Sequence, residues 1–227
     1  MIKAVLFDID NVLYNSSYQV EMARRAAVEA MIKVANWNIT VEEGMEKLEE
    51  IVKRYGSNFN KHYDMLMGNR KDKHKVVAAG IVAYHNTKRV YLKPYDDTIP
   101  TLTRLKSSGY KIGVITDGLS VKQWEKLVRL GLQDMFDVVL VSEEAGVEKP
   151  DPLIFEKACE ELEVLCEDCV YVGDRLDTDI IGANKAGMTS VRLLRGKYKD
   201  LKPQGLQERP DFEIKRMEEL LEILKNV

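Results

Sequence analysis

The chain has 227 residues, of which 45% are hydrophobic and 31% are charged, and its formal net charge is -3 at pH 7. This composition is typical of a globular protein and excludes a disordered chain, and the length suits one domain with a modest insert. The slight acidic excess argues against nucleic acid as the main partner, because a phosphate backbone selects a basic surface.

The hydrophobic segments do not indicate a membrane protein. The longest apolar run covers residues 76–84, whereas a transmembrane helix needs about 20 residues. Lys3 comes too early for a signal peptide, and the odd number of cysteines fits a reducing compartment. The Cys166-x-x-Cys169 pair could indicate a metal or redox site, but no second pair accompanies it, so ordinary buried thiols are favoured. We therefore expect a cytoplasmic protein without a membrane partner.

Short runs rich in Val, Ile and Leu predict the β-strands of the protein. The predicted strands are Ala4–Phe7, Ile112–Ile115, Val138–Val141, Val170–Val172 and Val191–Leu194. Each run is apolar on both faces, a pattern typical of strands that are buried on both sides in a parallel sheet. Helical segments alternate with these strands, so we predict an α/β fold with a doubly wound, Rossmann-like parallel sheet as its core.

Two of the helices between the strands have recognisable starts. The segment 120–123, Ser-Val-Lys-Gln, has the pattern of a capping box and predicts a helix that ends at Gly131. The buried face of this helix is expected to carry Val121, Trp124, Leu127 and Val128. Asp151 before Pro152 predicts the start of the following helix.

Helical patterns follow one another between the first two predicted strands. Ser16 begins one helix, the segment 40–43 begins the next with a capping box, and a third helix covers residues 76–84. The first of these helices is expected to carry Val20, Ala23, Ala27 and Met31 on one face. This region therefore predicts an all-helical insert.

The insert divides the chain into two predicted domains. Residues 1–15 and 93–227 form the α/β catalytic core, and residues 16–92 form a helical cap. The active crevice of an open parallel sheet lies at the carboxyl ends of its strands. An insert that leaves from the end of the first strand is therefore expected to lie over that crevice and to exclude water.

Acidic residues follow the predicted strands. Asp8 and Asp10 come directly after the first strand, and two carboxylates at the exit of a buried strand are costly unless their charge is offset. A turn in which an Asp caps the next helix would explain one of them but not both. Asp117 follows the second strand and Asp174 the fourth, and parallel strands bring their carboxyl ends to one edge of the sheet.

We expect these residues to form one site. It contains Asp8, Asp10, Asp174, Asp179, Thr116 and Lys149. Clustered carboxylates require a cation, and hard oxygen ligands favour Mg²⁺. A lysine and a hydroxyl beside that ion would hold a phosphate dianion.

The sequence resembles the haloacid dehalogenase superfamily over nearly its whole length. Its four motifs are similar, in chain order, to Asp8-Ile9-Asp10-Asn11-Val12, Thr116, Glu148-Lys149-Pro150 and Gly173–Asp179. The place of the insert resembles the helical-cap subgroup. Asn11 occupies a position at which the family usually has Gly or Asp, and we expect its side chain to point away from the site.

The resemblance implies a role for each acidic residue. Asp8 would attack phosphorus and form an aspartyl-phosphate. Asp10 would protonate the leaving alkoxide and then deprotonate the hydrolytic water. The Mg²⁺ ligands would be the Asp8 and Asp174 carboxylates and the backbone carbonyl of Asp10. Asp179 would support the site, although a helix N-cap is an alternative role for it.

The resemblance also implies how phosphate is held. The Thr116 hydroxyl and the backbone amides of Asp117 and Gly118 would bind the phosphoryl oxygens. Lys149 would pair with both Asp8 and phosphate. Substrate specificity is expected in the polar and aromatic segments 56–63 and 84–88, unless these are solvated loops and helix ends.

A narrower resemblance concerns the substrate. The segments 13–17, 55–58, 84–86 and 122–126 resemble an archaeal subgroup of the superfamily assigned as glyceraldehyde 3-phosphate phosphatases. This implies a phosphatase of a triose or small sugar phosphate. Separately, we expect a monomer or homodimer. The alternatives are a sugar-acid phosphatase, a phosphomutase, a haloacid dehalogenase, which needs no acid at the position of Asp10, and a non-catalytic metabolite-binding module.

Overall fold

The computed structural model describes residues 1–57 and 59–227. Asn58, which belongs to the predicted segments 55–58 and 56–63, lies outside the described residues. The chain divides into two compact units, one formed by Met1–Ser17 with Leu92–Val227 and the other by Tyr18–Tyr91. Among the described residues, none of the helices has the length and apolar character that a membrane span requires.

The first unit is built on a parallel six-stranded sheet with the order β3-β2-β1-β4-β5-β6. Its strands are β1 (Ala4–Phe7), β2 (Lys111–Thr116), β3 (Val138–Val141), β4 (Cys169–Gly173), β5 (Thr189–Leu193) and β6 (Phe212–Ile214). All the predicted strands are present, and β6 adds one that the sequence did not predict. With three residues and a half-exposed pattern, β6 lacks the apolar run that marks the others.

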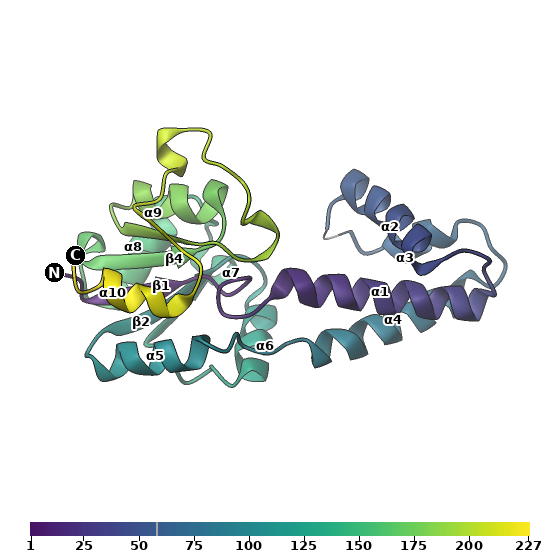
Figure 1. Ribbon diagram of the computed structural model, residues 1–227, viewed down its shortest axis with the longest axis horizontal. Helices are drawn as coiled ribbons and strands as arrows, with labels where there is room; N and C mark the ends of the chain where they lie inside the picture. Colours follow the sequence, from purple (N-terminus) through teal and green to yellow (C-terminus); the bar gives the residue numbers. More distant parts are fainter. Residues whose placement is uncertain (58) are drawn as a thin grey trace. The chain divides into compact units, whose positions relative to one another are not determined.

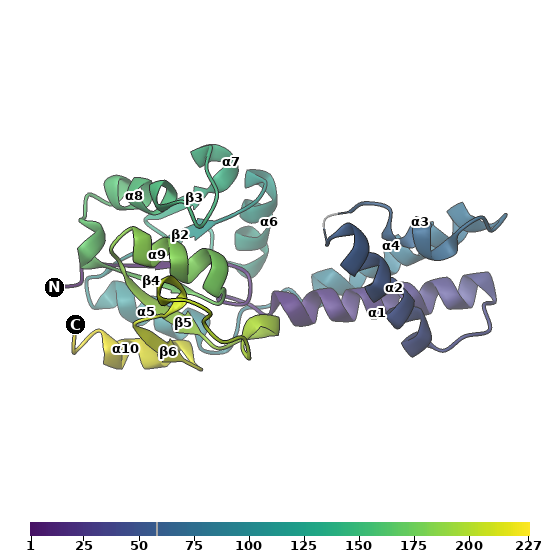
Figure 2. The same ribbon diagram turned by 90° about the horizontal axis from the view of Figure 1, so that it is seen from above.

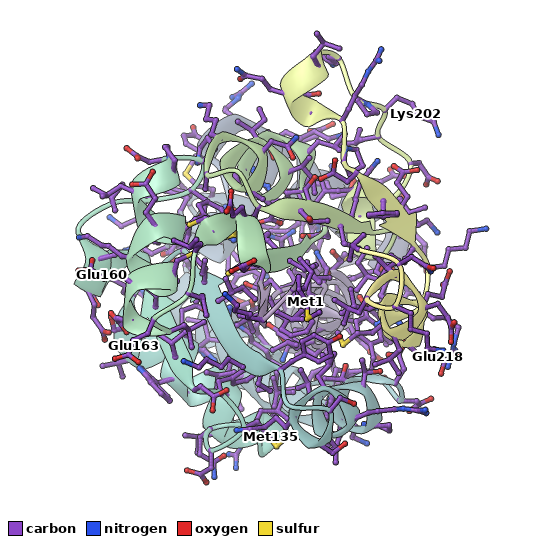
Figure 3. All side chains as sticks on the ribbon, turned by 90° about the vertical axis from the view of Figure 1, so that its left-hand side faces the viewer. Met1, Met135, Glu160, Glu163, Lys202 and Glu218 are labelled. Carbon is purple, nitrogen blue, oxygen red and sulfur yellow. The ribbon has the colours of Figure 1, made fainter. Side chains whose placement is uncertain are left out.

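Helices cover both faces of this sheet (Figure 1). Those of the first unit are α5 (Thr98–Ser107), α6 (Ser120–Leu130), α7 (Ser142–Ala145), α8 (Pro152–Glu161), α9 (Ile181–Lys185) and α10 (Leu220–Ile223). Along β1, Val5 and Phe7 pack in a hydrophobic cluster with α5, α6 and α10, whereas Ala4 and Leu6 pack in a second cluster with α7, α8 and α9. Figure 3 shows the two layers end-on, with Glu160 and Glu163 at the end of α8 on one side and Glu218 on the other. The predicted doubly wound α/β sheet is therefore confirmed.

The prediction for α6 was partly wrong. The helix begins after Leu119, and the Ser120 hydroxyl makes no hydrogen bond with the described residues. Val121 and Val128 were expected to be buried, but they are 78% and 59% exposed. Instead the buried face carries Ser120, Gln123, Leu127 and Leu130. Gln123 can lie on this face because its Nε2 donates to the Asp117 carbonyl, in the loop after β2, at 2.7 Å.

In the second unit, the regular secondary structure of the described residues is helical. It consists of α1 (Ser16–Ala35), α2 (Val41–Tyr55), α3 (His62–Met67) and α4 (Lys73–Val90). The predicted capping box is present, since Thr40 and Glu43 bond reciprocally at the start of α2. The helices α1 and α4 lie side by side (Figure 2), and Gln19 Nε2 donates to the Lys88 carbonyl at 2.7 Å between them. The insert between β1 and β2 is thus helical, as the predicted fold class requires.

Candidate active site

The sheet brings the predicted acidic residues to its carboxyl edge. Phe7 at the end of β1 is in register with Val114 on β2 and Val172 on β4. Asp8 follows β1 directly, and its amide donates to the Val172 carbonyl at 3.0 Å. Asp174 follows β4 in the same way. Because β4 pairs directly with β1, Asp8 and Asp174 meet at the carboxyl ends of these two strands.

Three buried carboxylates meet at this edge. One oxygen each from Asp8, Asp174 and Asp179 lies within 4.8 Å of the others. Burial raises the pKa of Asp8 to about 6. Burial and the neighbouring charges of Asp179 and Asp8 raise the pKa of Asp174 to about 8. The cluster is therefore short of positive charge, and its hard oxygen donors fit a divalent cation of the Mg²⁺ type.

Lys149 is the buried cation of the site. Its Nζ lies 3.0 Å from Asp8 Oδ1 and 2.7 Å from Asp179 Oδ1, and its side chain is 3% exposed. Burial acts to lower the pKa of Lys149, but the charges of Asp179 and Asp8 outweigh it and hold the pKa well above its usual value. The backbone amide of Lys149 donates to Asp117 Oδ1 at 3.0 Å, which fixes the loop before α8 to the loop after β2.

Asp179 braces the loop after β4. Its Oδ2 accepts from the backbone amides of Asp174 and Arg175 at 3.1 and 3.0 Å. Its Oδ1 accepts from Lys149 Nζ. The alternative role as a helix N-cap is not what the structure shows, because these amides precede Asp179 in the chain. Gly173 is needed beside it, since a Cβ there would lie 2.3 Å from the Asp179 Cβ.

The predicted phosphate-binding residues lie at the end of β2. Thr116 is the last residue of that strand and is buried. The Gly118 amide donates to Ser142 Oγ at 2.9 Å. Gly118 has φ 128°, and a Cβ there would lie 2.6 Å from Gln123 Nε2, so glycine suits this turn. Asp117 faces Lys149, as described above.

The side chain of Asp10 is not part of the carboxylate cluster. It is 39% exposed. Its Oδ2 accepts from Lys126 Nζ on α6, and its Oδ1 accepts from the Tyr14 hydroxyl, both at 2.6 Å. The Asp10 carboxylate is thus held by an ammonium and a phenol at the margin of the cluster.

The expectation for Asn11 was wrong. Its buried side chain points into the site, where Nδ2 donates to Asp174 Oδ2 at 2.9 Å. Tyr171 and Lys126 were not predicted either. The Tyr171 hydroxyl accepts from Lys149 Nζ at 3.1 Å and lies 3.1 Å from the Ile115 carbonyl. A tyrosine within an apolar strand was a usable signal, because a buried phenol needs a polar partner. Lys126 lies in the segment 122–126 that carries the narrower resemblance, but no local pattern gave it a role.

Comparison with known proteins places the chain among hydrolases. A profile of haloacid dehalogenase-like hydrolases matches residues 2–187. A glyceraldehyde 3-phosphate phosphatase of Methanopyrus kandleri is 53% identical over 100% of this chain and 99% of its own length. One of Methanocaldococcus jannaschii is 48% identical with the same coverage. The crystal structure of a HAD phosphatase from Thermococcus onnurineus superposes with a TM-score of 0.69 at 30% identity and covers 98% of each chain. The chain therefore belongs to the haloacid dehalogenase-like hydrolase family, and it is a phosphoric monoester hydrolase.

Proposed function

We propose that this haloacid dehalogenase-like hydrolase removes the phosphoryl group of a small sugar phosphate, with glyceraldehyde 3-phosphate as the first candidate. Catalysis depends on Mg²⁺ and proceeds through an aspartyl-phosphate on Asp8. The observation that carries the proposal is the buried pair of Asp8 and Lys149 beside Asp174. The names of the full-length archaeal relatives support the choice of substrate.

Asp8 suits the role of nucleophile. A carboxyl with a pKa of about 6 is mostly ionised at neutral pH, and its burial keeps bulk water from competing with a substrate. An Asp8 oxygen forms a bond to phosphorus while the bond from phosphorus to the sugar oxygen breaks. The electron pair of the broken bond stays on the sugar oxygen, which takes a proton from Asp10.

Hydrolysis of the intermediate reverses the role of Asp10. As a carboxylate it takes a proton from water, and the water oxygen bonds to phosphorus while the bond from phosphorus to Asp8 breaks. Inorganic phosphate leaves and the Asp8 carboxylate is restored. Lys126 and Tyr14 both contact the Asp10 side chain at 2.6 Å and so hold it in place between the two proton transfers.

Positive charge is needed because an anionic nucleophile approaches a phosphate dianion. Lys149, held charged by its neighbours, supplies part of it. A bound Mg²⁺ would supply the rest by neutralising phosphoryl oxygens. The Asp8 and Asp174 carboxylates and the Asp10 backbone carbonyl are the residues that would hold it. Asp179 supports the site by positioning Lys149.

The end of β2 is proposed to bind the remaining phosphoryl oxygens. The Thr116 hydroxyl and the amides of Asp117 and Gly118 are the donors. Gly118 would then exchange Ser142 Oγ for a phosphate oxygen. Such donors aim at the oxygens on which charge accumulates during transfer, where they contribute most.

The test is a phosphate-release assay with Mg²⁺ or with chelator. Glyceraldehyde 3-phosphate is compared with 3-phosphoglycerate, its sugar-acid counterpart, and with hexose phosphates, each with and without an added acceptor sugar. We expect fastest release from the triose phosphate, no effect of the acceptor, and no turnover in chelator. Faster release from 3-phosphoglycerate would move the substrate class to sugar acids, and acceleration by an acceptor sugar would indicate a phosphomutase.

Asp8→Asn tests the covalent step. We expect no turnover from this variant, because a neutral amide cannot attack phosphorus. Wild-type enzyme quenched in acid during turnover should carry one extra phosphoryl group on the peptide that contains Asp8, as seen by mass spectrometry. Turnover by Asp8→Asn would refute the assignment of Asp8 as the nucleophile. Turnover that persists in chelator would refute the dependence on a metal ion.

A further inference from the structure

The Asn11 side chain is held by hydrogen bonds at both ends of its amide. Its Nδ2 donates to Asp174 Oδ2 at 2.9 Å. Its Oδ1 accepts from the Ser17 backbone amide at 2.9 Å and from Ser16 Oγ at 3.0 Å, in the first turn of α1. A backbone amide can only donate, so the oxygen must face Ser17 and the nitrogen must face Asp174. The hydrogen bonds therefore fix the orientation of the amide.

The backbone and a neighbouring glycine restrict the same side chain. Asn11 has φ 60°, in the left-handed region that asparagine tolerates better than most residues. Gly196, in the loop after β5, approaches it so closely that a Cβ at residue 196 would lie 2.4 Å from Asn11 Cγ. The Asn11 amide is thus enclosed by the loop after β1, the start of α1 and the loop after β5.

We propose that Asn11 is a positioning residue that orients the Asp174 carboxylate for the divalent cation. This inference rests on the proposed function, because it assigns a purpose to Asp174 only if a metal binds there. Asn11 occupies one oxygen of Asp174 and so directs the other toward the space shared with Asp8. An amide does this without adding charge, whereas a carboxylate at residue 11 would add an anion to three that are already close together.

Partners that orient a metal ligand typically change metal affinity by about 10–100-fold when they are removed. Asn11→Gly keeps the left-handed backbone and removes the amide, so we expect Mg²⁺ to bind about 10–100-fold more weakly. Gly196→Ala leaves every hydrogen-bonding group in place but displaces the Asn11 amide, and it should weaken Mg²⁺ binding in the same direction. Saturating Mg²⁺ should restore most of the kcat of both variants.

Asn36→Gly is the matched control. Asn36 is also an asparagine with positive φ, 47°, but it is exposed and lies in the second unit, between α1 and α2. The same chemical change is made there in the unit that contains none of the named site residues. We expect its Mg²⁺ affinity to equal that of the wild type.

The experiment is calorimetric titration of the metal-free, full-length chain with Mg²⁺, with circular dichroism to confirm the fold. Weaker binding by Asn11→Gly and Gly196→Ala, with Asn36→Gly unchanged, is the expected result. If Asn11→Gly does not fold, Gly196→Ala decides the question. Affinities of both site variants within about twofold of wild type, or an equal loss in Asn36→Gly, would overturn the inference while the proposed function stands. If the wild-type chain binds no divalent cation, the proposed function itself is contradicted.

Discussion

Raising the pH from about 5 to about 8 in the presence of chelator is expected to destabilise the protein. Burial, with a smaller contribution from neighbouring carboxylates, raises the pKa of Asp8 to about 6 and that of Asp174 to about 8, from 3.8. In this pH window the folded state keeps protons that the unfolded state has released. The free energy of unfolding of the metal-free protein therefore falls as pH rises through the window.

The size of the loss follows from the two pKa values. Each pH unit over which only the folded state holds the proton costs about 1.4 kcal/mol. Asp174 keeps its proton over most of the window, which amounts to about 4 kcal/mol, and Asp8 ionises midway and adds about 1 kcal/mol. The charge of Asp8 is one cause of the raised pKa of Asp174, so the two losses overlap. We expect a total of about 4 kcal/mol.

Urea unfolding at several pH values, with and without Mg²⁺, measures this loss. Carboxylates whose pKa is lowered, such as Asp97, titrate below the window and do not offset it. If Mg²⁺ binds the ionised carboxylates as proposed, its stabilising effect should grow with pH. Because Asp174 carries most of the predicted effect, Asp174→Asn should remove most of the pH slope and the response to Mg²⁺.

Asp200→Asn is the control for this experiment. Asp200 is an exposed aspartate in the same unit, so its loss should leave the slope unchanged. A metal-free stability that stays level or rises between about pH 5 and about pH 8 would refute the reasoning, because the carboxylates would then not be held protonated by burial.

Three further substitutions test the roles of single residues. Asp10→Asn should lower kcat on a sugar phosphate by about 10²–10⁴-fold, but much less on an aryl phosphate whose leaving group needs no proton; equal losses on both would argue against the acid role. Lys149→Ala should lower kcat at least about tenfold. It should also destabilise the metal-free protein by about 3–5 kcal/mol, because Asp8 and Asp179 lose their buried partner. An unchanged kcat would show that Lys149 has no role in the site. Tyr171→Phe should cost about 1–3 kcal/mol in urea unfolding by taking away the hydroxyl that accepts from Lys149, and a stability equal to wild type would show that this hydroxyl contributes nothing.

Much of the sheet could be predicted because its strands are apolar on both faces. Ala4–Phe7 illustrates the point: successive side chains enter opposite hydrophobic clusters, so each one must be apolar. The meeting of Asp8 with Asp174 could be predicted for a related reason. Parallel strands start and stop at the same edges, so residues that follow two adjacent strands become neighbours whatever the length of chain between them.

The remaining features depend on partners that no local pattern identifies. Asn11 and Asp174 are 163 residues apart, and the direction of the Asn11 amide is decided by the loop geometry after β1. Helix α6 also shows that a local pattern does not always predict which residues are buried. Its periodicity allowed Val121 into the core, but Val121 is exposed, and Gln123 on the buried face donates to the Asp117 carbonyl instead. The buried face of α6 thus combines the polar Gln123 with Leu127 and Leu130, a mixture that apolar spacing alone does not predict.

The three clustered carboxylates have different hydrogen-bond partners, which indicates different roles. Asp179 accepts from Lys149 at one oxygen and from two backbone amides at the other, so both of its oxygens are used within the protein. Asp8 and Asp174 each have one oxygen held by a single side-chain donor, Lys149 and Asn11 respectively. A cation would therefore find its carboxylate ligands in Asp8 and Asp174, while Asp179 keeps Lys149 beside Asp8. In the proposed mechanism, this division lets three acids and one buried lysine hold a single divalent ion while Asp8 serves as the nucleophile.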